Sequence, residues 1–495
     1  MKKLAYIFIF LFSFACFSGC NLNSNSIEKL SANKSCYTIN ATFNNLDKSL
    51  SVDEEIKYVN NSKDTLKSVY FHIYPKAFTE GVINKPVSAL NEAKAYPNGK
   101  SYGTFNLNSL QVSSEDVEQK YTGDDKDILV VDLHEDLKPN KSVIINIKFS
   151  VELPNIHHRF GYGENTINLG NFYLIACVYE DGKFNTSPYH YNGDPFYSNM
   201  ANYNVTLTYD KSLTLASTGS FVAESEKDDL KTTCYKADGV RDFAMVLSDK
   251  FKMISEKIDN IMVNYFYYLD KNPTKSLQAS IDSIRTFNEL FGKYPYKVLN
   301  VCETNFVYGG MEYPNLVYIS DDLENYEDYI HTIVHEIAHQ WWYSVVGNDE
   351  FKYGFLDEGL TEFSTYLFYD ENPQYNMNTE EMIKNTTNSY LLFLDVYKEV
   401  FGKVDTTMLR SLDEYNTEPE YIYMSYVKGT LMFDSLKKVV GTTKFIKSLK
   451  HYYKTNFGEN VAPKNLIDAF NKCCGQNLES FFNSWFNGNV VIENM

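Results

Sequence analysis

The most constraining feature of this 495-residue chain is the segment 331–362, HTIVHEIAHQWWYSVVGNDEFKYGFLDEGLTE. His335 and His339 lie four residues apart in a window without Pro or Gly, which favours a helix with both imidazoles on one face. Two such imidazoles suit Zn²⁺, and Glu358 in a second helix-like segment can add a third protein ligand while one position stays open for water. Glu336 would lie beside the histidines as general base for that water. The segment predicts a zinc peptidase.

Length and charge narrow the function further. A chain of 495 residues is too long for one ordinary core, so two or three domains are expected. A hydrophobic share of 44% and a charged share of 22% are typical of a globular protein. The formal net charge of −18 argues against nucleic acid as a partner, because phosphate binding needs clustered Lys and Arg.

The N-terminus indicates export. Lys2 and Lys3 precede an apolar run, 4–17, that is too short to span a bilayer stably and is typical of a secretory signal. The Ser-Gly-Cys that ends at Cys20 resembles a bacterial lipobox, in which the cysteine is lipidated. We therefore expect a signal peptide over 1–19, a polar tether over 20–35 and attachment to the outer face of the bacterial cytoplasmic membrane through a lipid on Cys20. An ordinary cleaved signal, with secretion, and an uncleaved anchor are the alternatives.

The rest of the chain changes character near residue 252. From 36 to 252, short alternating segments such as SVDEEIKYV and SVIINIKFSVEL lie between turn residues, which predicts an all-β saddle or sandwich domain. From 253 to 495, strands around 297–306 and 316–320 are followed by mostly helical patterns, including a helix over about 329–345. The sequence thus predicts an α+β multidomain protein whose second domain is a mostly helical zinc-peptidase domain with a small β-sheet.

Several segments resemble those of the M1 aminopeptidases, a gluzincin family. The spacing from H-E-x-x-H to the next glutamate matches the family's, TNFVYGGMEYPNLVYIS is similar to its exopeptidase segment, and SYVKGTLMFDSLKKVVG is similar to the segment with its catalytic tyrosine. HYNGDPFYSNMANYNVTLTYDKSLTLASTG and FFNSWFNG resemble the late β-domain and the end of the catalytic domain. The resemblance implies a thermolysin-like catalytic domain and a zinc aminopeptidase.

The resemblance also implies residue roles around the metal. His335, His339 and Glu358 would be ligands of one zinc ion per chain. Glu336 would take a proton from the zinc-bound water and pass it to the leaving amine. Tyr426 would donate its phenolic O–H to the developing oxyanion, where loss of one donor typically costs about 10²–10³ in rate.

The segment Gly309–Glu312 would bind the substrate. Glu312 would pair with the free α-ammonium and so place the first peptide bond at the metal. Gly309 and Gly310 leave room for an extended peptide beside the strand edge, with Met311 between them and the glutamate. The family's Met-Glu-Asn reads Met-Glu-Tyr here, with Tyr313 in place of the asparagine. The expected substrates are peptides with free N-termini.

Other readings stay open at this stage. A zinc endopeptidase is one, motivated by Tyr313 and by the early end of the chain after FFNSWFNG, which also predicts that the helical lid domain of larger M1 enzymes is missing. A catalytically silent peptide-binding surface protein is another. Glu362 shares a helix face with Glu358 and would either orient a ligand histidine or lie in solvent. Nothing in the sequence indicates the oligomeric state.

Overall fold

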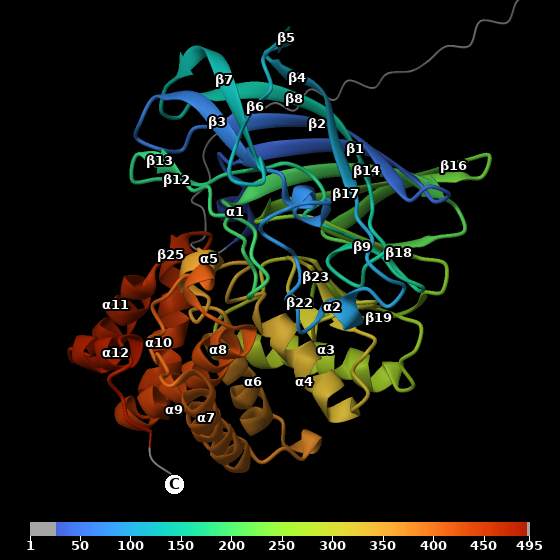
Figure 1. Cartoon of the computed structure of the whole chain (residues 1–495). Coiled ribbons are helices and arrows are strands. Elements are labelled where there is room, and N and C mark those ends of the chain that lie inside the picture. The colour runs from blue at the N-terminus through green and yellow to red at the C-terminus, as the bar shows by residue number, and fades with distance from the viewer. Residues whose placement is uncertain (1–25, 493–495) are drawn as a thin grey trace, which may run out of the picture.

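The computed structural model describes residues 26–492 and shows two domains, one built on β-sheets and one mostly of helices (Figure 1). The expected signal peptide and the lipidated Cys20 lie outside the described residues. The change of domain falls between β18 and β19, which belong to different sheets and are separated by residues 249–251. The α+β two-domain expectation is confirmed. No helix among residues 26–492 is long and apolar enough to cross a bilayer.

The first domain is built on an eight-stranded sheet in the order β16-β17-β14-β1-β2-β8-β4-β5. Its strands are β1 (Ser35–Asn44), β2 (Ser49–Val59), β4 (Thr104–Val112), β5 (Glu115–Asp116), β8 (Ser142–Glu152), β14 (Ala201–Asp210), β16 (Ser220–Lys227) and β17 (Leu230–Val240). Along β1 and β2, buried and exposed side chains alternate, as expected for a sheet with one face on the core. The alternation seen in the sequence is therefore that of this sheet.

Two four-stranded sheets complete the β-domain core. One is ordered β11-β3-β7-β6, the other β15-β18-β10-β9. Their strands are β3 (Leu66–His72), β6 (Lys120–Thr122), β7 (Ile128–Leu137), β9 (Phe160–Tyr162), β10 (Ile167–Gly170), β11 (Ile175–Ala176), β15 (Thr214–Ser217) and β18 (Ala244–Ser248). All of β10 and β18 is buried, because these strands lie where the two domains meet.

The tether prediction needs a correction over its second half. Residues 27–31 form helix α1 (Ile27–Ser31), and Leu30 is only 1% exposed because it packs into the hydrophobic core next to Gly239 of β17. Residue 35 is already the first residue of β1. The polar composition of the segment did not indicate that Leu30 would be buried. The segment from 27 to 35 is folded onto the β-domain.

The second domain combines a five-stranded sheet, ordered β19-β20-β21-β23-β22, with a bundle of helices. The strands are β19 (Lys252–Ile258), β20 (Ile261–Tyr267), β21 (Val298–Thr304), β22 (Gly310–Met311) and β23 (Leu316–Ser320). The main helices are α3 (Pro273–Leu290), α4 (Tyr326–Ala338), α6 (Glu358–Glu371), α7 (Thr379–Phe401), α9 (Lys428–Val440), α10 (Thr442–Thr455), α11 (Pro463–Cys474) and α12 (Glu479–Phe486). The short strand β22 is the edge of this sheet and pairs antiparallel with β23.

Helix α4 is shorter than the expected 329–345. It begins after Asn325, whose side chain accepts a hydrogen bond from the Glu327 amide, and it ends at Ala338 with His339 as its cap. The chain then turns without a Gly or Pro, and Tyr343 takes a positive φ of 138°. The Tyr343 hydroxyl donates to Asp242 of the β-domain at 2.5 Å. A tertiary contact therefore ends the regular structure that the local sequence favoured.

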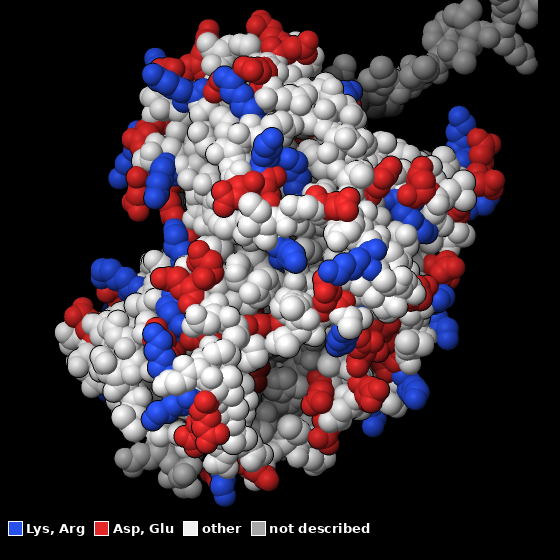
Figure 2. Space-filling view, in the orientation of Figure 1, with Lys and Arg blue, Asp and Glu red and all other residues white. Residues whose placement is uncertain are grey.

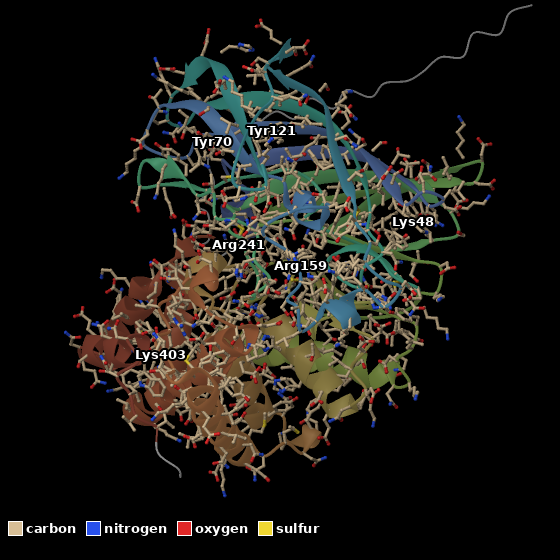
Figure 3. All side chains as sticks on the ribbon, in the orientation of Figure 1. Lys48, Tyr70, Tyr121, Arg159, Arg241 and Lys403 are labelled. Atoms are coloured by element: carbon tan, nitrogen blue, oxygen red, sulfur yellow. The ribbon has the colours of Figure 1, made fainter. Side chains whose placement is uncertain are left out.

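The two domains are joined by buried polar contacts. Arg241 donates to backbone carbonyls of the second domain, at 2.7 Å to Tyr343 and 2.8 Å to Glu459, and to that of Ser198 in its own domain at 2.9 Å. Figure 3 shows Arg241 and Arg159 at the junction of the two domains. Because a buried guanidinium needs partners for its donors, these bonds hold the domains in one arrangement.

Candidate active site

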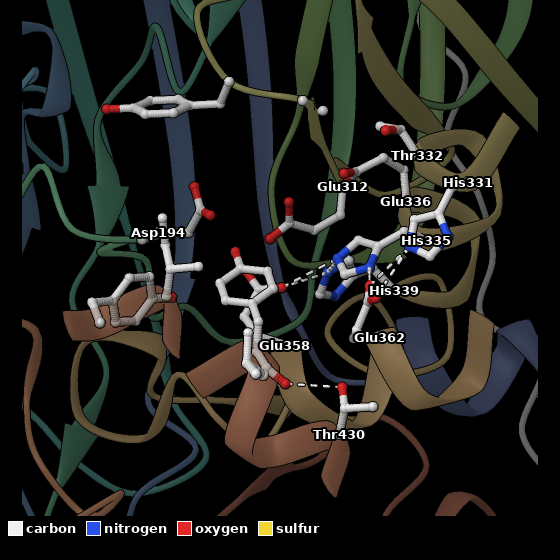
Figure 4. A pocket seen from close by; sticks show the side chains of 18 of the residues that line it. Asp194, Glu312, His331, Thr332, His335, Glu336, His339, Glu358, Glu362 and Thr430 are labelled. Atoms are coloured by element: carbon white, nitrogen blue, oxygen red, sulfur yellow. Dashed lines mark hydrogen bonds and ion pairs between the residues drawn. The ribbon is translucent and has the colours of Figure 1, made fainter. Parts of the chain in front are cut away.

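The three expected metal ligands converge in the structure. The Nε2 atoms of His335 and His339 are 3.2 Å apart, and they lie 3.3 and 3.2 Å from Glu358 Oε2. A tetrahedral zinc with bonds of roughly 2.0–2.1 Å separates its ligand atoms by roughly 3.3–3.4 Å. The donor types and the spacing therefore fit zinc. Figure 4 shows the histidines of α4 facing the glutamate of α6.

Both ligand histidines are oriented by their other ring nitrogen. His335 Nδ1 hydrogen-bonds with Glu362 Oε2 at 2.9 Å, and His339 Nδ1 with the Trp342 carbonyl at 3.0 Å. Since a carboxylate or a carbonyl only accepts, each Nδ1 carries the hydrogen and each Nε2 keeps a free lone pair for a metal. Of the two roles left open for Glu362, the structure supports the orienting one. Glu362 also bonds His331 Nε2 at 3.1 Å.

Glu336 lies beside the three expected metal ligands, in a position that is shielded from water. Its side chain is 5% exposed and Oε2 has no hydrogen-bond partner among the described residues. Burial raises the pKa of Glu336 to about 7. Gly310 makes this placement possible, because a Cβ there would collide with Glu336 Oε1. A carboxyl that titrates near neutral pH suits both accepting and returning a proton.

Tyr426 approaches the three expected metal ligands from another helical segment. It lies in a π-helical turn, η4 (Tyr423–Val427), between α8 (Glu418–Ile422) and α9, and such turns often occur at functional sites. Its hydroxyl donates to Glu358 Oε1 at 2.5 Å. Burial, and then the Glu358 charge, raises its pKa well above the usual range, so the phenol keeps its proton.

A glycine contact sets the distance between these two helices. A Cβ on Gly429 of α9 would lie 2.7 Å from the Cα of Gly359 of α6, and the reverse distance is 2.8 Å. The backbones can approach this closely only without side chains. Because Gly359 follows Glu358 and Gly429 lies three residues after Tyr426, the contact brings the metal ligand and the tyrosine together.

Gly429→Ala should therefore damage both the fold and the site. We expect a loss of about 1–3 kcal/mol in the free energy of unfolding, as for other overpacked positions, because the helices must separate. Urea unfolding followed by circular dichroism measures it. Gly309→Ala is the matched control, since its added methyl would meet Thr332 at an ordinary 3.7 Å. Equal stability of the two variants would contradict the role of the glycine contact.

Of the predicted substrate segment, Gly309, Gly310 and Glu312 line the cavity, whereas the Met311 side chain does not. Met311 is fully buried in the hydrophobic core. Side chains alternate along a strand, so residues 310 and 312 face the cavity and 311 faces the core. Tyr313 also points away, donating to Asn171 of the β-domain at 2.6 Å.

The sequence reasoning missed two residues of the β-domain that line the same cavity, Asp194 and Arg159. The Arg159 guanidinium lies 2.6 Å from an Asp194 oxygen, and the two side chains are 3% and 14% exposed. In Figure 4, Asp194 and Glu312 lie on the same side of the ligand histidines.

Glu312 Oε1 has no hydrogen-bond partner among the described residues. Burial, and then Asp194, raises the Glu312 pKa well above its usual range. Two carboxyls, of which only Asp194 is paired with a positive charge, thus face one space, and this suits the binding of a positively charged group.

The cavity that holds these groups has a volume of about 630 Å³. It lies between the domains, and Figure 2 shows a hollow on this face with acidic side chains at its edge. The volume is in the range of pockets that bind small molecules or a few residues of peptide.

Residues 275–485 match the peptidase family M1 domain. This part of the chain is therefore similar to the peptidases of family M1. Among curated relatives, mitochondrial aminopeptidase 2 of Saccharomyces cerevisiae is 26% identical over 305 residues, and aminopeptidase M1-D of Oryza sativa subsp. japonica is 24% identical over 305 residues. Each match covers 58% of this chain but only 31% and 34% of the relative. The chain thus matches about a third of the length of these M1 relatives.

The fold has close counterparts among solved structures. The M1 zinc metallopeptidase of Deinococcus radiodurans superposes with a TM-score of 0.67 at 15% identity, over 95% of this chain and all of that chain. A mutant of that enzyme bound to a Tyr-Ser-Ala substrate superposes with a TM-score of 0.66, also at 15% identity, over 95% and 100% of the two chains. At this identity the likeness establishes the M1 fold with its two domains.

Proposed function

We propose that the protein is a zinc-dependent aminopeptidase that removes N-terminal residues from peptides. The observation that carries the proposal is the pair of carboxyls, Glu312 and Asp194, next to a donor triad that fits zinc. A Glu312 oxygen lies within 4.8 Å of a His339 ring nitrogen, so an ammonium held there would be about one residue from the metal position. That distance suits the first peptide bond of a chain with a free N-terminus.

The other side chains supply the proton chemistry. A bound zinc ion would polarise the scissile carbonyl and lower the pKa of a coordinated water. Glu336 would accept the proton of the attacking water and return it to the leaving amine. The Tyr426 hydroxyl, which here donates to Glu358, would turn to the oxyanion that develops on the carbonyl. The buried positions of Glu336 and Tyr426 strengthen these interactions, because little water screens them.

Blocking the substrate's N-terminus tests the role of the two carboxyls. We expect rapid release of the first residue from a free hexapeptide and at least about 100-fold slower cleavage of its N-acetylated twin, because the acetyl group removes the charge that Glu312 binds. Mass spectrometry of the products measures both rates. Equal cleavage of the two peptides would replace the aminopeptidase proposal with the endopeptidase one, and no cleavage of either would favour the silent binding protein.

Zinc content provides a readout that does not depend on turnover. We expect about one zinc per chain by elemental analysis and a higher unfolding temperature with zinc than after chelation, because only the folded triad binds the ion. Glu358→Gln should lose most of this stabilisation. The control is Glu371→Gln, an exposed position at the end of the same helix. A protein that holds no zinc after reconstitution would overturn the proposal.

We further propose that the enzyme acts outside the cytoplasm as a lipoprotein, on the basis of Lys2, Lys3, the apolar run and the Ser-Gly-Cys ending at Cys20. Metabolic labelling with a fatty acid should mark the wild-type chain and leave Cys20→Ser unlabelled. A labelled Cys20→Ser chain would contradict the lipid site.

A further inference from the structure

We propose that Glu418 makes this site selective for peptides whose N-terminal residue is arginine or lysine. The inference rests on the proposed function and names the substrate class of the same site. Glu418 is the first residue of α8, lines the cavity, and is only 8% exposed. None of the proposed catalytic steps uses it.

Glu418 would lie close to the substrate's first side chain, because it lines the same cavity as the groups proposed to bind the α-ammonium. Burial, and then the Glu418 charge, raises the pKa of the Tyr308 phenol well above its usual range. The nearby Arg159 charge lowers this pKa, and the Asp194 charge raises it. Tyr421, three residues later on α8, reaches the loop of Asp194, since a Cβ on Gly193 would collide with the Tyr421 hydroxyl. Glu418 thus shares a side of the cavity with the groups proposed to bind the α-ammonium.

The Glu418 carboxylate has hydrogen bonds but no counter-charge. Its oxygens accept from Ser88 Oγ at 2.5 Å and from Asn91 Nδ2 at 2.9 and 3.0 Å, across the domain boundary. These neutral donors fix its position, and no ion pair to it is found among residues 26–492. In a cavity partly shielded from water, an anion that is held in place but not neutralised attracts a cation strongly.

The surroundings favour a positive side chain further. Among the described residues that line the cavity, six are acidic and one is an Arg or Lys: Arg159, Asp194, Glu312, Glu336, Glu358, Glu362 and Glu418. Arg159 is paired with Asp194, so its charge does not offset that of Glu418. The Tyr308 hydroxyl is buried and has no hydrogen-bond partner within the described part of the chain. A guanidinium could donate to both this hydroxyl and Glu418, which an aliphatic side chain cannot do.

The test compares substrates that differ in charge but little in shape. We expect wild-type kcat/KM for arginyl-aminomethylcoumarin to exceed that for the citrullyl compound by about 10- to 100-fold, the usual contribution of a charged hydrogen bond. Lysyl and norleucyl compounds form a second matched pair. In Glu418→Gln both ratios should fall to near 1, while turnover of the norleucyl substrate stays within about threefold of wild type.

The controls separate charge selection from a purely structural bond between the domains. Ser88→Ala removes one donor to Glu418 but keeps the carboxylate, so the arginine preference should persist. Zinc content and unfolding temperature establish that each variant is folded, and Glu418→Asp, which should keep a reduced preference, serves if Glu418→Gln does not fold. Equal cleavage of arginyl and citrullyl substrates, or unchanged ratios in Glu418→Gln, would overturn the inference and leave the aminopeptidase proposal intact. Failure to cleave any of the four substrates would overturn the proposed function itself.

Discussion

Glu336→Gln should abolish peptide hydrolysis while leaving zinc bound. The glutamine keeps the shape of the side chain beside Gly310 but cannot accept a proton from water or return one to the leaving amine. We expect kcat/KM to fall by about 10³–10⁴, the upper range for a general base, and the zinc content to stay at about one per chain. Initial rates on an aminoacyl-coumarin substrate and elemental analysis of the same sample measure the two quantities.

The control for this variant lies on the same helix. Glu327→Gln changes an exposed carboxylate in the first turn of α4 and should leave the rate within about twofold. If Glu336→Gln also lost its zinc, the defect would lie in the metal site and not in proton transfer. If it kept more than about a tenth of wild-type activity, Glu336 would not be the base.

The sequence could indicate the candidate metal ligands because their determinants are local. His335 and His339 depend only on helical spacing, and Glu358 on a short second segment, so each could be placed by periodicity before any tertiary structure was known. The β-sheet domain over 36–252 could be predicted in the same way, because its alternation follows from the sheet's one buried face. These features require no knowledge of distant contacts.

The substrate side of the site depended on contacts that are remote in sequence. Asp194 and Arg159 approach Glu312 from irregular segments of the β-domain, far away along the chain, and no spacing rule connects them. The segment that contains Asp194 was noted for its family resemblance, yet nothing local marked that residue. The contact of Gly359 with Gly429, 70 positions apart, is likewise a property of two packed helices.

The errors have physical causes as well. Met311 was assigned to the substrate surface as part of a motif, although strand alternation places it opposite Gly310 and Glu312. The expected helix to 345 followed helical propensity, but the buried Tyr343–Asp242 bond outweighs propensity, which contributes less than about 1 kcal/mol per residue. Tertiary structure overrides local preference most readily near a domain boundary, where such buried polar bonds form.

Tyr426→Phe should reduce kcat by about 10²–10³ and change KM by less than about threefold, because the hydroxyl is needed where charge develops and not for binding the peptide. The ring can remain in place, since it stacks near His335 with an interplanar angle of 16° and a centroid distance of 6.0 Å. Zinc affinity should also stay within a few-fold, as Glu358 loses only one donor. Steady-state kinetics on a dipeptide, with zinc titration of the apoprotein, measures these effects.

Tyr423→Phe is the matched control in the same π-helical turn. Its hydroxyl shares a hydrogen bond with Ser389 Oγ at 2.8 Å and does not contact the metal ligands, so kcat should change by less than about threefold. A rise in KM as large as the fall in kcat for Tyr426→Phe would show that the tyrosine also binds the substrate in the ground state. Equal losses in the two variants would mean that the turn's packing matters and not the hydroxyl. A selective fall in kcat for Tyr426→Phe would place the phenol at the oxyanion. Removing a group lowers kcat without raising KM only when the bond of that group strengthens in the transition state.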